Sequence, residues 1–95
     1  MAKFKLGQTV MTRGVNDKIA EDSKFSKFVM GSMQRHAAGD WGDMEKEDLK
    51  ANEDALMTGE ARLFSAYEPG NELPKIWIIT EWDRSVTTVL FPDEY

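Results

Sequence analysis

A glycine-rich bend at residues 39–43, with the sequence Gly-Asp-Trp-Gly-Asp, most constrains what this chain can fold into. It follows Arg35 and His36, the only histidine, and it separates two segments with helical periodicity. Two glycines around an Asp-Trp pair predict a backbone turned into conformations that most residues avoid. A large aromatic side chain in such a bend needs a fixed seat. We therefore expect Trp41 to be tucked beneath a corner between two helices.

The segment before the bend has the pattern of an amphipathic helix. From Phe25 to His36, one face repeats at intervals of three and four residues and is mostly apolar. Ser23 is the predicted N-cap, because its hydroxyl can accept a bond from an unpaired amide of the first turn. Gly39 is predicted to end the helix.

The segment after the bend predicts a second helix over residues 44–57. Asp43 is its predicted N-cap, and acidic residues in its first turns suit the positive end of the helix dipole. Gly59 closes it. Because the connection is short, we expect the two helices to pack as a hairpin or a corner.

The remainder of the chain has strand patterns. Residues 61–67, 75–81 and 85–91 are predicted strands, separated by turn signals at 68–71 and 83–84 and stopped by Pro92. The middle strand is apolar on both faces from Ile76 to Ile79, which predicts a central place in the sheet.

The N-terminal segment 1–16 alternates loosely over residues 4–12, which is compatible with an edge strand or with an ordered arm. Asn16 or Asp17 is expected to cap a short helical turn after it. We therefore predict a single α+β domain over 1–95. Its helical pair packs on one face of a three-stranded antiparallel meander, which the N-terminal strand can widen.

Composition narrows the class of protein. There is no cysteine, which excludes disulfides and thiolate metal sites and suits a reducing cytosol. No apolar run is long enough to span a bilayer, and the N-terminus lacks the hydrophobic stretch of a signal peptide. We expect a soluble cytoplasmic protein, monomeric or homodimeric, without a membrane partner and without a cofactor.

The net charge of −5 is unevenly distributed along the chain. Segment 1–16 carries Lys3, Lys5 and Arg13 and no acid, whereas the region 40–60 is strongly acidic. This balance argues against direct nucleic-acid binding, which depends on clustered lysine and arginine. The acidic region either keeps a small protein soluble or faces a basic surface on another protein.

His36 has two interpretations. On an apolar helix face, a buried neutral imidazole would bond a carboxylate, a backbone carbonyl or Asn52 of the second helix. Alternatively it is a general base or metal ligand oriented by Asp40 or Asp43, in a pocket that also includes Trp41. One histidine without cysteine gives little support to a metal site, and none is predicted.

The segment 80–85 is predicted to form the last hairpin turn. Glu81, Asp83 and Arg84 are expected to make a charged cluster that fixes it. Trp82 beside these charges is typical of an interface anchor with a polar rim, but its ring could instead cover an end of the core.

Several segments resemble a family of small bacterial plasmid-related proteins. The resemblance lies in Arg35-His36 with the 39–43 bend, in 62–67, and above all in 76–95, where Ile-Trp-Ile-Ile-Thr-Glu is followed by Asp-Arg-Ser, Thr-Thr-Val-Leu and Phe-Pro-Asp-Glu-Tyr. It covers residues 33–95, and the N-terminal third departs from it. Trp82 stands where we expect a small residue in relatives. The resemblance implies mobile-element cargo and assigns no catalytic residue.

These observations predict a non-enzymatic protein that binds another protein. Its specific form would be an inhibitor of a host defence complex, of the anti-CRISPR or anti-restriction kind, whose acidic face competes for a basic groove. The alternative is a small enzyme or ligand-binding domain with a pocket around His36. The candidate binding residues are Trp82, Asp83, Arg84, Glu47, Glu53 and Asp54, and the candidate pocket residues are His36, Asp40, Trp41 and Asn52.

Overall fold

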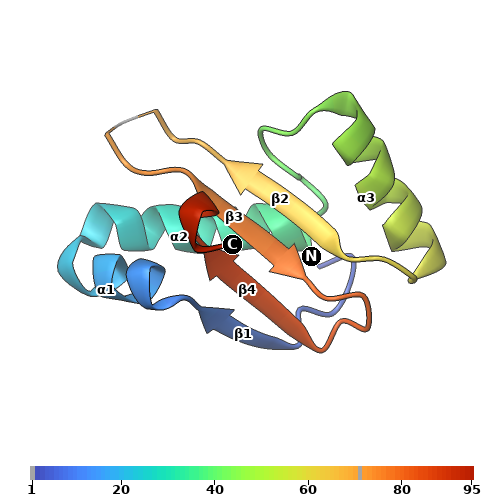
Figure 1. The fold of residues 1–95 in the computed structure, drawn as a ribbon, viewed down its shortest axis with the longest axis horizontal. Helices are drawn as coiled ribbons and strands as arrows, with labels where there is room; N and C mark the ends of the chain where they lie inside the picture. The colour runs from blue at the N-terminus through green and yellow to red at the C-terminus, as the bar shows by residue number, and fades with distance from the viewer. Residues whose placement is uncertain (1, 71) are drawn as a thin grey trace.

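The computed structural model describes residues 2–70 and 72–95, so Asn71 of the predicted 68–71 turn lies outside the described residues. Figure 1 shows one four-stranded sheet in the order β1-β4-β3-β2, with helices behind it and beside it. The elements are β1 (Gln8–Met11), α1 (Arg13–Glu21), α2 (Ser23–Ala37), α3 (Lys46–Thr58), β2 (Leu63–Tyr67), β3 (Ile76–Thr80), β4 (Val86–Leu90) and the 3-10 helix η1 (Pro92–Glu94).

The predicted α+β class is confirmed. β2, β3 and β4 form the antiparallel meander, and β1 widens it by pairing parallel to β4. β3 lies between two partners, as its apolar pattern predicts. The segment 1–16 was predicted to be either an edge strand or an ordered arm. It contains both, and it also includes the start of α1.

The main core lies between the sheet and the pair α1 and α2. In Figure 1, α2 passes behind the sheet and α1 lies at the left, beyond the end of β1. Alternate residues of β3, such as Ile76 and Ile78, point into this layer and are fully buried. The helices contribute apolar residues at the spacing that the sequence predicts. The buried members of this core are Val15, Phe25, Val29, Tyr67, Ile76, Ile78 and Val89.

A smaller second core lies beside β2, where α3 packs. Its buried members are Trp41, Ala55 and Leu63. The neighbours of the helices thus differ from the expected hairpin: α2 packs with α1, and α3 packs with β2. The difference arises because the bend continues along the edge of β2 before α3 begins, as described below.

The structure corrects the N-caps that were predicted for three helices. α2 is capped by Asp22 rather than by Ser23, because the Asp22 carboxylate accepts from the amides of Lys24 (3.0 Å) and Phe25 (3.2 Å). The pKa of Asp22 is held below its usual value, chiefly by the bond from the Phe25 amide. α3 begins after Glu45, whose side chain makes no capping bond, so Asp43 is not its cap.

The third correction concerns α1, which starts at Arg13 and needs no cap from Asn16 or Asp17. The carboxylate of Glu94, far along the chain in η1, caps it instead. It accepts from the Gly14 amide (3.1 Å) and from the Thr12 hydroxyl (2.5 Å). A cap from the other end of the sequence satisfies the same orphan donors as a local one.

The predicted helix ends are confirmed, since Gly39 and Gly59 both have left-handed backbones, with φ of 84° and 71°. No helix in the described ranges is long and apolar enough to cross a membrane.

Candidate functional site

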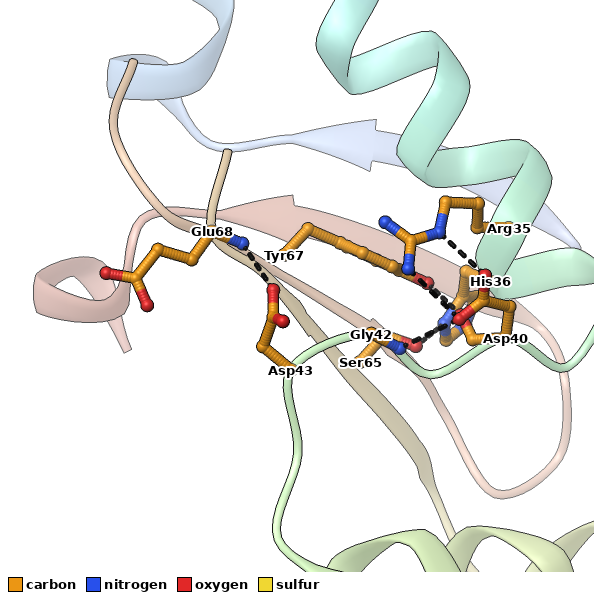
Figure 2. A network of polar contacts seen from close by, with 8 residues as sticks. All are labelled: Arg35, His36, Asp40, Gly42, Asp43, Ser65, Tyr67 and Glu68. Atoms are coloured by element: carbon orange, nitrogen blue, oxygen red, sulfur yellow. Dashed lines mark hydrogen bonds and ion pairs between the residues drawn. The ribbon is translucent and has the colours of Figure 1, made fainter. Parts of the chain in front are cut away.

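The bend is organised around the Asp40 side chain. The Arg35 guanidinium binds its carboxylate through two bonds of 2.7 and 3.1 Å, and the Gly42 amide adds a third of 3.2 Å (Figure 2). The bonds from Arg35 lower the pKa of Asp40 against the opposing effect of burial, and the Gly42 amide adds to the lowering. Asp40 therefore stays ionised and serves to fix the bend.

Tyr67 supports the same bend from β2. Its hydroxyl donates to the Asp40 carbonyl at 2.6 Å, and the Arg35 guanidinium lies over its ring at 4.8 Å. Burial raises the pKa of Tyr67 to about 12. The ring thus joins α2, the bend and the sheet as a neutral hydrogen-bond donor.

Beyond Asp40 the chain runs along the outer edge of β2 and pairs with it at one isolated bridge. The Ala66 amide donates to the Trp41 carbonyl (3.2 Å), and the Asp43 amide donates to the Ala66 carbonyl (2.7 Å). Gly42 and Ala66 form a parallel bridge. The Asp43 carboxylate then accepts from the Glu68 amide at 2.9 Å, as Figure 2 shows. Asp43 therefore closes the sheet edge instead of capping a helix.

Gly42 is required by this close approach. Its φ is 76°, and an added Cβ would lie 2.1 Å from the Ala66 carbonyl oxygen and 2.6 Å from the Tyr67 ring. Any other residue would both strain the backbone and push the segment off the strand.

Asn52 completes the cover of the β2 edge from α3. Its side-chain amide donates to the Phe64 carbonyl (2.6 Å), and its side-chain oxygen accepts from the Phe64 amide (3.0 Å). Asn52 thus reproduces both bonds of a neighbouring strand. Both side-chain groups of Asn52 are bonded to Phe64 and not to His36, so the predicted pairing of Asn52 with His36 is wrong.

His36 instead bonds two hydroxyls of the sheet. Its Nδ1 faces the Ser65 hydroxyl, and its Nε2 lies 2.9 Å from the Thr80 hydroxyl. The Thr80 hydroxyl is also hydrogen-bonded to the Thr87 hydroxyl at 2.7 Å, and the Thr87 hydroxyl donates to the Leu6 carbonyl at 2.6 Å. The chain of bonds therefore joins α2, three strands and the N-terminal arm.

The carbonyl at the end of this chain assigns each proton between Leu6 and Nε2 of His36. Thr87 gives its single hydrogen to Leu6, so Thr80 must donate to Thr87. Thr80 can then only accept from His36, which places the imidazole hydrogen on Nε2. Burial lowers the pKa of His36 to about 4, so near neutral pH Nδ1 carries no proton and accepts from Ser65. The neutral ring therefore has one defined tautomer.

The imidazole is sealed from solvent. His36 is 0% exposed, and burial lowers its pKa to about 4. Phe4 of the N-terminal arm packs edge-on against it at 5.4 Å, and Trp41 does the same at 5.6 Å. Asp40 and Asp43 are both bonded elsewhere, so neither orients the ring. This arrangement favours the structural interpretation of His36 over a general base.

Trp41 has the fixed, buried position that the sequence of the bend predicts. It is 4% exposed, and its Nε1 donates to the Glu53 carboxylate at 2.7 Å. Glu53 is therefore part of the structural support of the bend, although the sequence suggested it as a binding residue.

Arg84 fixes the turn between β3 and β4, but it bonds the Glu81 carbonyl (3.1 Å) rather than the carboxylates of Glu81 and Asp83. It donates to main-chain carbonyls of three segments, among them Ala55 in α3 (3.1 Å), Ala61 before β2 (2.8 Å) and Trp82 in the turn (3.1 Å). Arg84 has a left-handed φ of 60°. It is a structural clamp rather than a freely offered binding residue.

Asp83 and Trp82 occupy the outside of this clamped turn. The Asp83 carboxylate accepts from the Ser85 hydroxyl (2.6 Å) and amide (3.1 Å), and these bonds lower its pKa. Trp82 is 60% exposed. Its ring therefore does not cover the core, which was one of its two predicted roles.

The remaining acidic candidates lie on the exposed side of α3. Asp54 pairs with Lys50 at 3.1 Å, and Glu47 has no bonded partner among the described residues. Glu47 precedes Ala55 by eight residues, about 12 Å along the helix, so it lies well away from Arg84 and the turn. The structure thus places Glu47 apart from the candidate binding residues of the turn, which are Trp82, Asp83 and Arg84.

Two of the best-formed hollows among the described residues are not lined by His36. One of about 520 Å³ lies beside η1, and one of about 340 Å³ lies between α3 and β2. Asn52 lines the second, but its amide is bonded to β2. The structure therefore brings His36 and Trp41 into contact, and it directs Asp40 and Asn52 to other partners.

The sequence interpretation missed Ser65, Thr80 and Thr87, which are fully buried. Small hydroxyl residues at inward positions of apolar strands are the signal that could have found them. Among residues 2–70 and 72–95, no group of three His, Cys, Asp or Glu side chains is arranged to hold a metal ion. No family model, curated protein or solved structure matches this chain.

Proposed function

We propose that this protein acts by binding another protein at the end of the molecule where the β3–β4 turn meets α3. We name this surface the Trp82 end, and define it by the exposed residues Asp54, Met57, Trp82 and Asp83. Both segments lie on the right-hand side of Figure 1, and Arg84 bonds them to each other.

The single observation that carries the proposal is the presentation of Trp82. Its side chain is 60% exposed, while its backbone is held by a guanidinium that also binds α3 and the entry to β2. An aromatic side chain on a pre-organised turn loses little conformational entropy when it is buried by a partner. Met57, which is 87% exposed, adds apolar surface on the neighbouring helix.

Charge indicates the kind of partner. Asp54 and Asp83 belong to the Trp82 end, and Glu47 and Asp48 extend the acidic character along α3. Opposite potentials speed encounter, so a basic surface fits best. The resemblance to plasmid-related proteins supports a specific form: an inhibitor that competes with nucleic acid for the basic groove of a host defence complex, of the anti-CRISPR or anti-restriction kind.

The test is affinity capture from a host lysate with tagged variants. Trp82→Ala is expected to lose a stoichiometric partner that the wild type retains. Glu47→Gln with Asp54→Asn is expected to weaken binding and reduce its salt dependence. Met30→Ala is the matched control, because Met30 is 63% exposed on α2, away from this surface. Glu53 is left intact, since it holds Trp41.

A partner that both test variants retain would contradict the proposal. If the wild type retains no partner, the proposal also fails, and a ligand screen comparing wild type with His36→Leu would test the alternative pocket.

A further inference from the structure

The two outer strands of the sheet differ in how their outward backbone groups are used. On β2, the amides of Phe64, Ala66 and Glu68 are all bonded by residues of the bend and α3. Figure 1 shows no element on the far side of β1, at the lower rim of the sheet. β1 is therefore the open edge of this sheet.

The direction of the β1 backbone follows from its pairing with β4. The amides of Gln8 and Thr12 donate to the carbonyls of Ser85 and Val89 at 2.9 and 3.0 Å. Because backbone groups alternate along a strand, those of Thr9 and Met11 point away from β4. Within the part of the chain that the structure describes, no backbone bond reaches the amides of these two residues from the open side.

The usual protections of an edge strand are few here. Natural edges carry proline, lysine or a bulge, or are covered by another segment. The sequence of β1 is Gln-Thr-Val-Met, which has no charge and no proline, and its only protection is its length of four residues. Thr9 is exposed, and Val10 and Met11 are partly exposed, so an added strand would also meet apolar side chains.

The charges at the two ends of this edge select the occupant. Lys5 precedes β1 and Arg13 follows it, and both are exposed. Asp17 approaches Arg13 only at 4.0 Å, with both side chains largely solvated. A second copy paired antiparallel along β1 would place Arg13 of one chain near Lys5 of the other, which is unfavourable. An extended segment with acidic ends would meet opposite charge at both ends.

We propose that β1 is a docking edge for an acidic extended segment of a partner, which adds a fifth strand through the outward backbone groups of Thr9 and Met11. Main-chain bonds would supply affinity, and Lys5 and Arg13 would supply selectivity. This edge begins beside the Trp82 end, because the Gln8 amide bonds the Ser85 carbonyl, but the proposal does not depend on the function proposed there.

The test uses two eight-residue probe peptides with a Val-Thr-Val-Thr centre, one with two acidic residues at each end and one with two lysines at each end. Amide spectra of the labelled protein report binding at each residue. The acidic peptide is expected to shift the Thr9 and Met11 amides and slow their hydrogen exchange. Its binding should be at least tenfold tighter than that of the lysine peptide.

Two variants with one matched control identify the groups responsible. Thr9→Pro removes an outward donor without touching a bond to β4, and it should weaken the acidic peptide at least tenfold. Lys5→Glu with Arg13→Glu should do the same. Lys27→Glu with Lys46→Glu changes the net charge equally on exposed positions of α2 and α3, and should change binding less than twofold.

Three results would overturn the proposal. They are no shift at Thr9 and Met11 with either peptide, equal binding of both peptides, and shifts at β1 that depend on protein concentration alone, which would mean that copies pair there. Trp82→Ala should leave peptide binding unchanged, so failure at the edge is distinguishable from failure of the Trp82 end.

Discussion

β2 and β1 are the two outer strands of one sheet, and their outward-facing backbone groups meet very different surroundings. Along β2, the bend and Asn52 bond the groups of Phe64 and Ala66, and Asp43 bonds the amide of Glu68. Along β1, the groups of Thr9 and Met11 face outward without such cover. The comparison shows that the most distinctive motif of the sequence closes an edge, whereas an undistinguished segment leaves one open.

The comparison also changes how the bend is understood. Its glycines, carboxylates and tryptophan have the composition of a binding loop, but each performs a structural task. Gly42 permits close approach, Asp40 holds the bend, and Asp43 bonds the next amide of β2. The surfaces proposed for binding lie elsewhere, at the Trp82 end and at β1.

The largest expected effect comes from Gly42→Ala. The added methyl group would collide with the Ala66 carbonyl and the Tyr67 ring. We expect a loss of about 3 kcal/mol or more in the free energy of unfolding, measured by urea denaturation. Gly59→Ala is the control, because its φ is similar and no atom lies within 4 Å of the added group, so it should cost about 1 kcal/mol. Equal losses would mean that close approach at β2 is unimportant.

The next largest effect is a pH dependence of the free energy of unfolding, caused by the buried His36. Its pKa is 6.5 when unfolded and about 4 when folded, so the unfolded chain binds the proton first as the pH falls. The free energy of unfolding should therefore be steady above pH 6.5 and decline by up to roughly 3 kcal/mol towards pH 4.

Denaturation of wild type and His36→Leu across this pH range checks the assignment. The variant should lack the decline between pH 6.5 and 4. The lowered pKa values of Asp40 and Glu94 add a separate loss at lower pH, because those carboxylates stabilise the fold only while ionised. A parallel decline in both proteins would contradict the buried neutral imidazole.

A smaller effect is expected for Asn52→Leu. The substitution leaves the Phe64 amide and carbonyl without their partners, which should cost about 2 kcal/mol and speed hydrogen exchange at Phe64. Asn16→Leu is the control, since Asn16 is exposed on α1. Normal exchange at Phe64 in the Asn52 variant would show that the side chain does not close this edge.

The smallest effect is expected on the open side of the sheet. Thr9→Lys places a charge on an exposed position of β1 and breaks no bond to β4, so it should change the free energy of unfolding by less than about 0.5 kcal/mol. Thermal denaturation beside wild type checks it. A loss comparable to that of Asn52→Leu would mean that β1 is supported from its outer side.

Much of the fold could be predicted because it depends on local patterns. The repeat from Phe25 to His36 defines α2, and the doubly apolar run at Ile76–Ile79 defines the central strand. The ends of helices were less predictable, since adjacent residues compete. Asp22 rather than Ser23 caps α2 because its carboxylate reaches two amides.

The site was less predictable because its partners lie far apart along the chain. His36 is 29 residues from Ser65 and 44 from Thr80, and only the register of the strands brings those hydroxyls together. Glu94 reaches α1 from 80 residues away. A single sequence contains no signal for such pairings, although it did predict the buried seat of Trp41.

The measurement that tests the central claim most directly is native-state hydrogen exchange of the outward amides on both edges. The amides of Phe64, Ala66 and Glu68 should exchange orders of magnitude more slowly than unstructured amides, because opening them requires release of the bend or α3. Those of Thr9 and Met11 should exchange near the unstructured rate. Comparable protection on both edges would contradict the account of one closed and one open edge.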